Sequence, residues 1–251
     1  MLNIVVPMAG HGSRFSKAGY TVPKPLIPVL GKPMIQIVIE NLRPSRPYHF
    51  IFVCQQEHLD SYGLGSLLSD IAPGCDIVPV SKVTEGAACT VLLTKHLINN
   101  DTPLMIANCD QYIDARIDDY LAAFDLQDMD GWIMTMTAND PKWSYILLDE
   151  QGSITRVVEK EVVSNEATVG IYNYNEGQMF VAAAEAMIAK NLRVNGEFYV
   201  APAYDQLING GARVGFYNIG TVEKGMHGLG TPADLEIFLG TSIAKEIWHA
   251  A

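Results

Sequence analysis

The sequence has few cysteines and no apolar stretch long enough to cross a membrane. Cys54, Cys75, Cys89 and Cys109 form neither a C-x-x-C pair nor the spacing of a metal finger. Because no signal peptide precedes them, we expect reduced thiols in a cytoplasmic protein. No uncharged apolar run approaches the roughly 18 residues that a membrane span needs, so we expect no membrane partner.

Cationic residues are scarce, but they are unevenly distributed. The chain has 17 Lys and Arg against 28 Asp and Glu, a net charge of −11, which argues against a nucleic-acid partner. No acidic residue precedes Glu40, whereas Arg14, Lys17, Lys24 and Lys32 all lie in that first stretch. A local cationic pocket on an acidic protein suits a small polyanionic ligand.

The common nucleotide-binding and metal motifs are missing. The segment Gly10–Phe15 follows an apolar run, and its glycines would let backbone N–H groups approach a phosphate. A dinucleotide fingerprint needs a third glycine and an immediate helix, but Phe15 stands there and prolines follow. Gly31–Pro33 lacks the Ser or Thr of a P-loop, and the six histidines form no H-E-x-x-H pattern.

Strand-like and helix-like segments alternate through the first half of the chain. Runs of apolar, β-rich residues predict strands buried on both faces, beginning at Leu2, Tyr48, Asp76, Thr102 and Gly131. Helical spacing predicts helices over residues 33–42, over 85–97 and from 117. This alternation predicts a doubly wound, Rossmann-like fold with three α/β/α layers and a mainly parallel mixed sheet.

The pattern changes after Trp143. Residues 145–161 predict two strands around Gln151-Gly152, and strands from Ala167 and Arg213 flank an alanine-rich helix over residues 177–192. Thr231 is placed to cap a final helix that has Pro232 at its first position. Because there is no linker or repeat, we expect a single domain, 1–251, whose second half extends the same sheet and covers the site.

A series of motifs resembles one enzyme family. The segment GHGSRFSKAGYTVPKPLIPVLGKPMI is followed, in order, by TEGAA, NCD, VEK, SNEATVGIY, NGEF and GLGTPADL. Together they resemble the nucleotidylyltransferases that join a nucleoside triphosphate to a sugar 1-phosphate or a similar phosphate ester. GSRFSKAGYTVPKP resembles the corresponding segment of short capsule-pathway members and of phosphocholine or phosphoglutamine cytidylyltransferases. The resemblance implies a nucleotide-binding half, 1–142, and an acceptor-binding half, 143–251.

The resemblance assigns the first segment to the triphosphate. The loop that would bind the triphosphate contains Ala9, Gly10, Gly12 and Ser13. The charge that accumulates as pyrophosphate leaves would be neutralised by Arg14 and Lys24. Thr84, Gly86 and Ala87 match the turn against which the base packs. The resemblance favours CTP or UTP over a purine triphosphate, although Ser81 falls near the position where uridine- and thymidine-using members often carry glutamine.

Asp110 ends an apolar strand at the sheet edge where α/β proteins bind ligands. The matching family residue anchors Mg²⁺ on the nucleotide phosphates, so we expect Mg²⁺ as cofactor. A cap of the following helix is the structural alternative, which Asp114 fits better. Many relatives carry a second metal carboxylate where this chain has Gly228. We therefore expect Asp110 to be the single protein anchor, because the adjacent His227 suits this ion poorly.

The remaining motifs belong to the second substrate. The family's lysine matching Lys160 grips the acceptor phosphate, and Gly170 and Glu197 match positions that line the acceptor pocket. Lys160 is equally consistent with an exposed lysine at a strand end. Two rival functions stay open: a nucleotide-sugar-dependent glycosyltransferase, which usually has D-x-D where this chain has Asn108–Asp110, and a non-catalytic nucleotide-binding regulator. Which base, which ester and whether the chain forms a homo-oligomer stay open as well.

Overall fold

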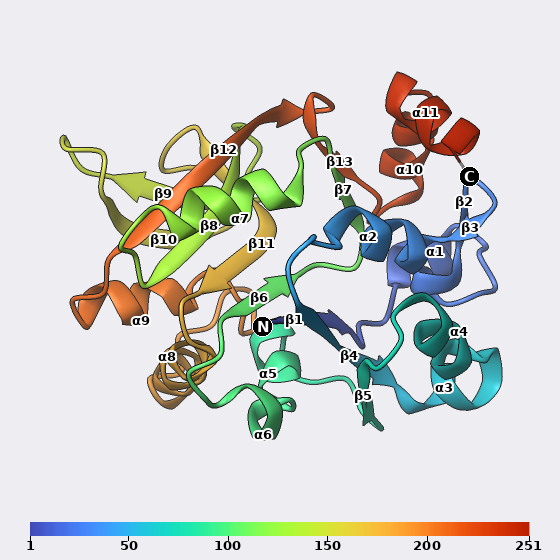
Figure 1. The fold of residues 1–251 in the computed structure, drawn as a ribbon, viewed down its shortest axis with the longest axis horizontal. Helices are drawn as coiled ribbons and strands as arrows, with labels where there is room; N and C mark the ends of the chain where they lie inside the picture. Colours follow the sequence, from blue (N-terminus) through green and yellow to red (C-terminus); the bar gives the residue numbers. More distant parts are fainter. Residues whose placement is uncertain (251) are drawn as a thin grey trace.

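The computed structural model describes the backbone of residues 1–250 and the side chains of residues 1–248 (Figure 1). A mixed sheet with the order β5-β4-β1-β6-β11-β8-β12-β13-β7 runs through the molecule, and the β9–β10 hairpin is attached at β11. This order can be followed in Figure 1 from β5 at the bottom to β12 at the upper left. The strands are β1 (Leu2–Met8), β2 (Pro28–Val29), β3 (Lys32–Pro33), β4 (Tyr48–Gln55), β5 (Asp76–Val80), β6 (Leu104–Ala107), β7 (Gln111–Ile113), β8 (Gly131–Thr137), β9 (Ser144–Leu148), β10 (Ile154–Glu159), β11 (Glu166–Tyr174), β12 (Val214–Val222) and β13 (Gly225–Gly228).

The sheet is mainly parallel, as predicted. β1 pairs in parallel with both β4 and β6, β4 pairs in parallel with β5, and β8, β12 and β13 form a second parallel set. β11 joins the two sets because it is antiparallel to β6 and to β8. Strands from residues 143–251 therefore belong to the same sheet as those from residues 1–142, and β11 lies between two strands of the first half.

Helices cover both faces of the sheet. They are α1 (Ser13–Lys17), a 3-10 turn η1 (Lys24–Leu26), α2 (Met34–Leu42), α3 (Gln56–Tyr62), α4 (Leu64–Ile71), α5 (Ala87–Leu92), α6 (Lys95–Ile98), α7 (Ile117–Asp125), α8 (Gly177–Ala189), α9 (Ala203–Asn209), α10 (Pro232–Leu239) and α11 (Ser242–Ala250). Alternate residues of β1 belong to different cores: Ile4 and Val6 pack with α2, α4 and α7, whereas Val5 packs with α5, α8 and α9. This alternation produces the predicted three layers.

Several local predictions were wrong. The helix predicted over 85–97 is two short helices, because the Leu93 and Thr94 N–H groups donate to the Thr90 and Val91 carbonyls, three residues earlier instead of four. Asp114 does not cap α7, which begins after Arg116 with no side-chain cap; the Asp114 N–H instead donates to the Gly225 carbonyl. The short helix α1 (Ser13–Lys17) begins within the Gly10–Phe15 segment, where only a loop was expected.

The end of the chain confirms one capping prediction and corrects another. Thr231 caps α10, because its hydroxyl accepts a hydrogen bond from the Asp234 N–H at 3.1 Å. α10 is not the final helix, since Thr241 accepts from the Ala244 N–H at 3.2 Å and begins α11. Of the helices in residues 1–250, none combines the length and the apolar character that crossing a bilayer requires.

Candidate active site

The glycine-rich loop lies at the carboxyl end of β1. Residues 9–12 leave the strand, and Gly12 adopts a left-handed conformation (φ 59°) from which α1 starts. A Cβ atom at Gly12 would lie only 3.3 Å from the Lys24 Cβ, so the loop and η1 approach closely there. Phe15 anchors α1, since its ring is buried and packs edge-on against Tyr20. Arg14 on α1 and Lys24 on η1 thereby line the same cleft.

Lys24 and Asp110 form an ion pair. Asp110 follows β6, and its Oδ2 atom lies 2.7 Å from the Lys24 Nζ atom, with about a quarter of each side chain exposed (21% and 27%). Burial alone would lower the pKa of Lys24, but the Coulombic attraction of Asp110 and their hydrogen bond outweigh it and raise the pKa. The ammonium is therefore charged at any physiological pH, next to the carboxylate predicted to hold metal.

The surroundings of Asp110 fit a metal ion that takes one carboxylate from the protein and its other ligands from water and from substrate phosphates. A Cβ atom at Gly230 would lie 2.7 Å from the Asp110 Oδ2 atom, so only glycine leaves that space to the carboxylate. Within residues 1–248, no three His, Cys, Asp or Glu side chains gather as a metal site. Mg²⁺ commonly takes one or two carboxylates and completes its shell with water and phosphate oxygens. One carboxylate facing the cleft satisfies that requirement.

The two positions near the missing carboxylate do not add a ligand to the cleft. A Cβ atom at Gly228 would meet the Asp234 side chain at 3.4 Å, and that carboxylate accepts a hydrogen bond from the Thr231 hydroxyl. His227 is buried, with 2% of its surface exposed, and packs against Tyr112 and Phe238. Burial lowers the pKa of His227. The His227 side chain therefore belongs to the core.

The turn predicted to meet the base is hydrogen-bonded to the NGEF segment. The Thr84 hydroxyl donates to the Gly86 carbonyl at 2.9 Å. The Phe198 N–H donates to the Glu85 carbonyl at 2.8 Å, and the Ala88 N–H donates to the Phe198 carbonyl at 3.0 Å. Gly86 (φ 134°) has no room for a side chain, because a Cβ would lie 2.4 Å from the Phe198 carbonyl oxygen. The sequence identified both segments without indicating that they touch.

Lys160 reaches the cleft because it leaves the strand in an unusual conformation. It follows β10 with φ at 57°, in the left-handed region that few residues other than glycine adopt. Its Nζ atom donates to the Tyr199 hydroxyl at 2.5 Å and lies 4.5 Å from the centre of that ring. The preceding Glu159 accepts a hydrogen bond from the Ser144 hydroxyl, and burial raises the pKa of its carboxyl. This part of the cleft combines cations, carboxylates and aromatic rings.

Gly170 allows the end of β6 to meet β11. It has φ at 83° within an irregularity of β11, and a Cβ there would lie 2.1 Å from the Asn108 Nδ2 atom. The Asn108 N–H also donates to the Gly170 carbonyl at 3.0 Å. Gly170 therefore makes room for the Asn108 amide, which lines the cleft.

A single cleft of about 620 Å³ contains every residue predicted for the site. The predicted residues that line it are Ala9, Gly10, Gly12, Ser13, Arg14, Lys24, Thr84, Gly86, Ala87, Asp110, Lys160, Gly170 and Glu197. The sequence reasoning assigned no role to Asn108, Lys142, Trp143, Ser144, Thr168 and Tyr199, which also line it. Asn108 and Thr168 had a usable signal, since each lies in a motif two residues before a predicted site residue, Asp110 and Gly170 respectively.

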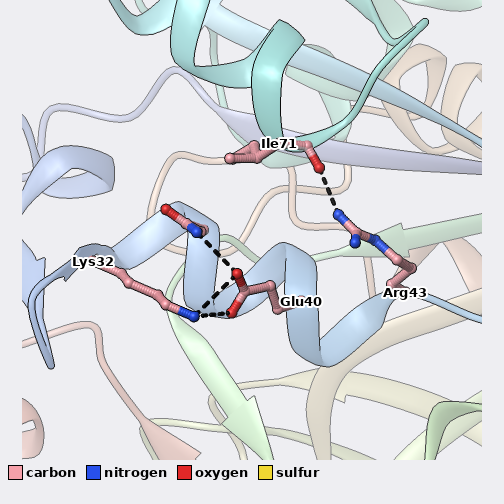
Figure 2. A network of polar contacts seen from close by, with 5 residues as sticks. Lys32, Glu40, Arg43 and Ile71 are labelled. Atoms are coloured by element: carbon pink, nitrogen blue, oxygen red, sulfur yellow. Dashed lines mark hydrogen bonds and ion pairs between the residues drawn. The ribbon is translucent and has the colours of Figure 1, made fainter. Parts of the chain in front are cut away.

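One of the four early cations is used elsewhere. Figure 2 shows Lys32 directed toward Glu40 of α2, with Nζ 2.9 Å from the nearer carboxylate oxygen. Gln36 donates to the same carboxylate at 2.9 Å. Neither Lys17 nor Lys32 lines the cleft, so the positive charge of the acid-free stretch reaches the cleft through Arg14 and Lys24.

Comparison with known proteins identifies the class. Residues 4–201 match the nucleotidyl transferase family, and the chain therefore belongs to that family. The bifunctional protein GlmU of Paraburkholderia xenovorans is 27% identical over 220 residues, which is 85% of this chain and 46% of that protein. GlmU of Cupriavidus metallidurans is 25% identical over 224 residues, with the same shares. The chain thus spans about half the length of the curated relatives it matches.

Solved structures confirm the predicted fold. A nucleoside-diphosphate-sugar pyrophosphorylase from Vibrio cholerae has a TM-score of 0.79 at 23% identity, covering 95% of this chain and 100% of that one. The inositol-1-phosphate CTP transferase of T. maritima has a TM-score of 0.72 at 16% identity, covering 98% and 94%. The prediction of a Rossmann-like nucleotidyltransferase fold is therefore correct.

Proposed function

We propose that the protein transfers a nucleotidyl group from a nucleoside triphosphate to a sugar 1-phosphate or a similar small phosphate ester. An oxygen of the acceptor phosphate attacks the α-phosphorus, a new P–O–P linkage forms, and the bond to the leaving pyrophosphate breaks. The observation that carries this proposal is the joint lining of one cleft by the glycine loop with Arg14 and Lys24, by Asp110 and by Lys160. Two phosphate-bearing substrates need two cationic positions within one cavity.

The loop side of the cleft binds the triphosphate. Arg14 and Lys24 meet the negative charge that grows on the β- and γ-phosphates as pyrophosphate departs. Asp110 would hold Mg²⁺, which when bound neutralises phosphate charge and fixes the geometry of the triphosphate. Since Lys24 Nζ lies 2.7 Å from Asp110 in this structure, Lys24 exchanges that carboxylate for phosphate oxygens when the substrate binds.

The acceptor needs positioning more than deprotonation. A phosphate monoester is already largely dianionic near neutral pH, because its second pKa is about 6. Lys160 holds that phosphate, and Gly170 and Glu197 contact the rest of the acceptor. Catalysis then consists of alignment and charge neutralisation, without a general base. Residues 1–142 supply most of the nucleotide contacts, and residues 143–251 supply most of the acceptor contacts.

The finer assignments follow the resemblance and the relatives. A pyrimidine triphosphate, CTP or UTP, is favoured by the cytidylyltransferase-like first segment and by two structural neighbours, named as a CTP transferase and a UDP-glucose pyrophosphorylase. A nucleoside-diphosphate product would serve capsule or polysaccharide synthesis. The four free cysteines, Cys54, Cys75, Cys89 and Cys109, fit the reducing cytoplasm.

A grid of triphosphates against phosphate esters, assayed by pyrophosphate release with Mg²⁺, tests the proposal. For at least one pair, we expect pyrophosphate to form in an amount equal to the product in which the nucleoside and the acceptor are joined by a diphosphate. Absence of pyrophosphate from every pair, together with sugar transfer when a nucleotide sugar is supplied in a parallel assay, would support the glycosyltransferase instead. Tight triphosphate binding without turnover for any ester would support a regulator. Either result would contradict nucleotidyl transfer.

A further inference from the structure

Gln55 reaches the glycine loop from the neighbouring strand. It is the last residue of β4, whose Cys54 pairs with Met8 of β1, so its side chain lies beside the residues that follow β1. Its Nε2 atom donates to the Ala9 carbonyl at 3.1 Å and to the Gly10 carbonyl at 2.9 Å. One amide group therefore binds two consecutive peptide carbonyls of the loop, although Gln55 is not among the residues lining the cleft.

These two bonds determine where the loop's donors point. A trans peptide directs its C=O and the following N–H to opposite sides, and residues 1–250 contain no cis peptide bond. The N–H groups of Gly10 and His11 therefore point away from Gln55, and both residues line the cleft. Within the described part of the chain, the N–H groups of Gly10, His11 and Gly12 donate to no other residue. Consecutive unpaired N–H groups form a concavity that binds anions.

We propose that Gln55 is a positioning residue for the triphosphate: it holds the Ala9 and Gly10 carbonyls behind the loop and thereby turns the Gly10 and His11 N–H groups toward the phosphates. This inference rests on the proposed function of the loop. According to this inference, the neutral Gln55 side chain, which lies outside the cleft, contributes part of the affinity for the triphosphate. Arg14 and Lys24 supply the charge, and Gln55 supplies the orientation of the backbone donors.

The chemistry of the amide makes the role testable by residues of equal length. In Gln55→Met the donor is lost with little change in length. In Gln55→Glu the shape is kept, but a carboxylate that only accepts hydrogen bonds faces two carbonyl oxygens. Gln56, the next residue, provides the control, because its Nε2 atom donates to the Asp60 carboxylate at 2.8 Å within α3 and, among the described residues, to no carbonyl of the glycine loop.

The experiment measures binding of inorganic tripolyphosphate, a probe that carries no base, by calorimetry in the presence of Mg²⁺. Loss of oriented donors to a charged ligand should weaken the affinity of Gln55→Met about tenfold, with a larger loss for Gln55→Glu. Gln56→Met should bind as the wild type does. Binding of glucose 1-phosphate, used as the phosphate-ester probe and measured separately, should be the same in all three variants as in the wild type, which a general collapse of the cleft would not allow.

A measurement on the wild type keeps the inference falsifiable if the variants do not fold. On adding tripolyphosphate, the amide resonances of Gly10 and His11 should shift more than those of Ala18 and Gly19, which lie beyond α1. Wild-type affinity in both Gln55 variants, or unshifted Gly10 and His11 amides in a protein that binds tripolyphosphate, would overturn the role of Gln55 alone. Absence of tripolyphosphate binding by the wild type would overturn the proposed triphosphate site as well.

Discussion

The two sides of the cleft, which we propose bind the two phosphate-bearing substrates, are built from different parts of the chain. The loop side, residues 9–24, uses backbone N–H groups and two cations from one short segment, and the nearest carboxylate, Asp110, is already paired with Lys24. The acceptor side is formed by Lys142, Glu159 and Lys160 together with Glu197 and Tyr199. The loop side is therefore suited to a ligand that is almost all charge, whereas the acceptor side is suited to a single phosphate on a polar body.

Removal of the carboxylate at Asp110 should have the largest effect. Asp110→Asn keeps the size of the side chain but lacks the charge that would hold Mg²⁺, so Mg²⁺-dependent pyrophosphate release should fall to the level measured without the metal. Asp114→Asn, a change outside this cleft, is the control. If the variant keeps its response to Mg²⁺, the loop side does not depend on a metal anchored at Asp110. The proposed difference between the two sides of the cleft would then be wrong.

Loss of either loop-side cation should come next. Arg14→Ala and Lys24→Ala each remove a charge that faces the departing pyrophosphate, and such a contact commonly contributes about 10²–10³ in rate. Turnover is measured with saturating substrates, and circular dichroism checks the fold. Lys32→Ala breaks an ion pair with Glu40 outside the cleft and should leave turnover unchanged. Near-normal rates in both variants would show that the loop-side cations do not take part in the reaction.

Substitution of Lys160 should separate the two sides of the cleft. Loss of its ammonium should raise the KM for the acceptor by roughly 10–100-fold, while the Kd of the triphosphate stays constant. Because the backbone of Lys160 has a left-handed conformation, Lys160→Gly preserves that conformation better than Lys160→Ala does. Agreement between these variants would assign the effect to the charge. A loss of triphosphate affinity alone would reverse the two sides.

Glu159 should give the smallest effect, visible in stability. Burial raises the pKa of its carboxyl above the ordinary value of 4.5, so ionisation costs folding free energy as the pH rises through the folded-state pKa. Glu159→Gln removes that cost. The Tm of the variant should therefore match the wild type near pH 4 and exceed it slightly at pH 7. The exposed Glu161→Gln should show no such trend, and a variant less stable at pH 7 would contradict the burial argument.

The loop side could be predicted from the sequence because it is local. The absence of acids before Glu40, the glycines of the loop and the prolines around Lys24 all lie within one segment, and the structure places Arg14 and Lys24 in one cleft. Strands rich in apolar residues were predicted for the same reason, because burial on both faces leaves a continuous pattern. The short paired strands β7 and β13 were not predicted, because three or four residues are too few to show the alternation of apolar residues that indicates a strand.

The acceptor side could not be predicted in this way. Lys160 contacts Tyr199 across 39 residues of chain, and Trp143 and Ser144 enter the cleft only because β9 pairs with β10 and meets β11. The antiparallel insertion of β11 between β6 and β8 sets these neighbours, and no local pattern encodes it. Gly170 is explained only once Asn108 is seen to occupy the space where a Cβ would lie.

The hydrogen bonds between Glu85, Ala88 and Phe198 bear on how the protein folds. They close a chain loop of great length, comparable to the 108 residues between Glu85 and Arg193, which also form an ion pair. Loop closure of this kind is entropically costly and slows folding, so such contacts form late. During synthesis, the turn at Gly86 emerges well before the segment that supports it. The turn at Gly86, where we propose that the base packs, is therefore completed only when the second half of the chain has docked.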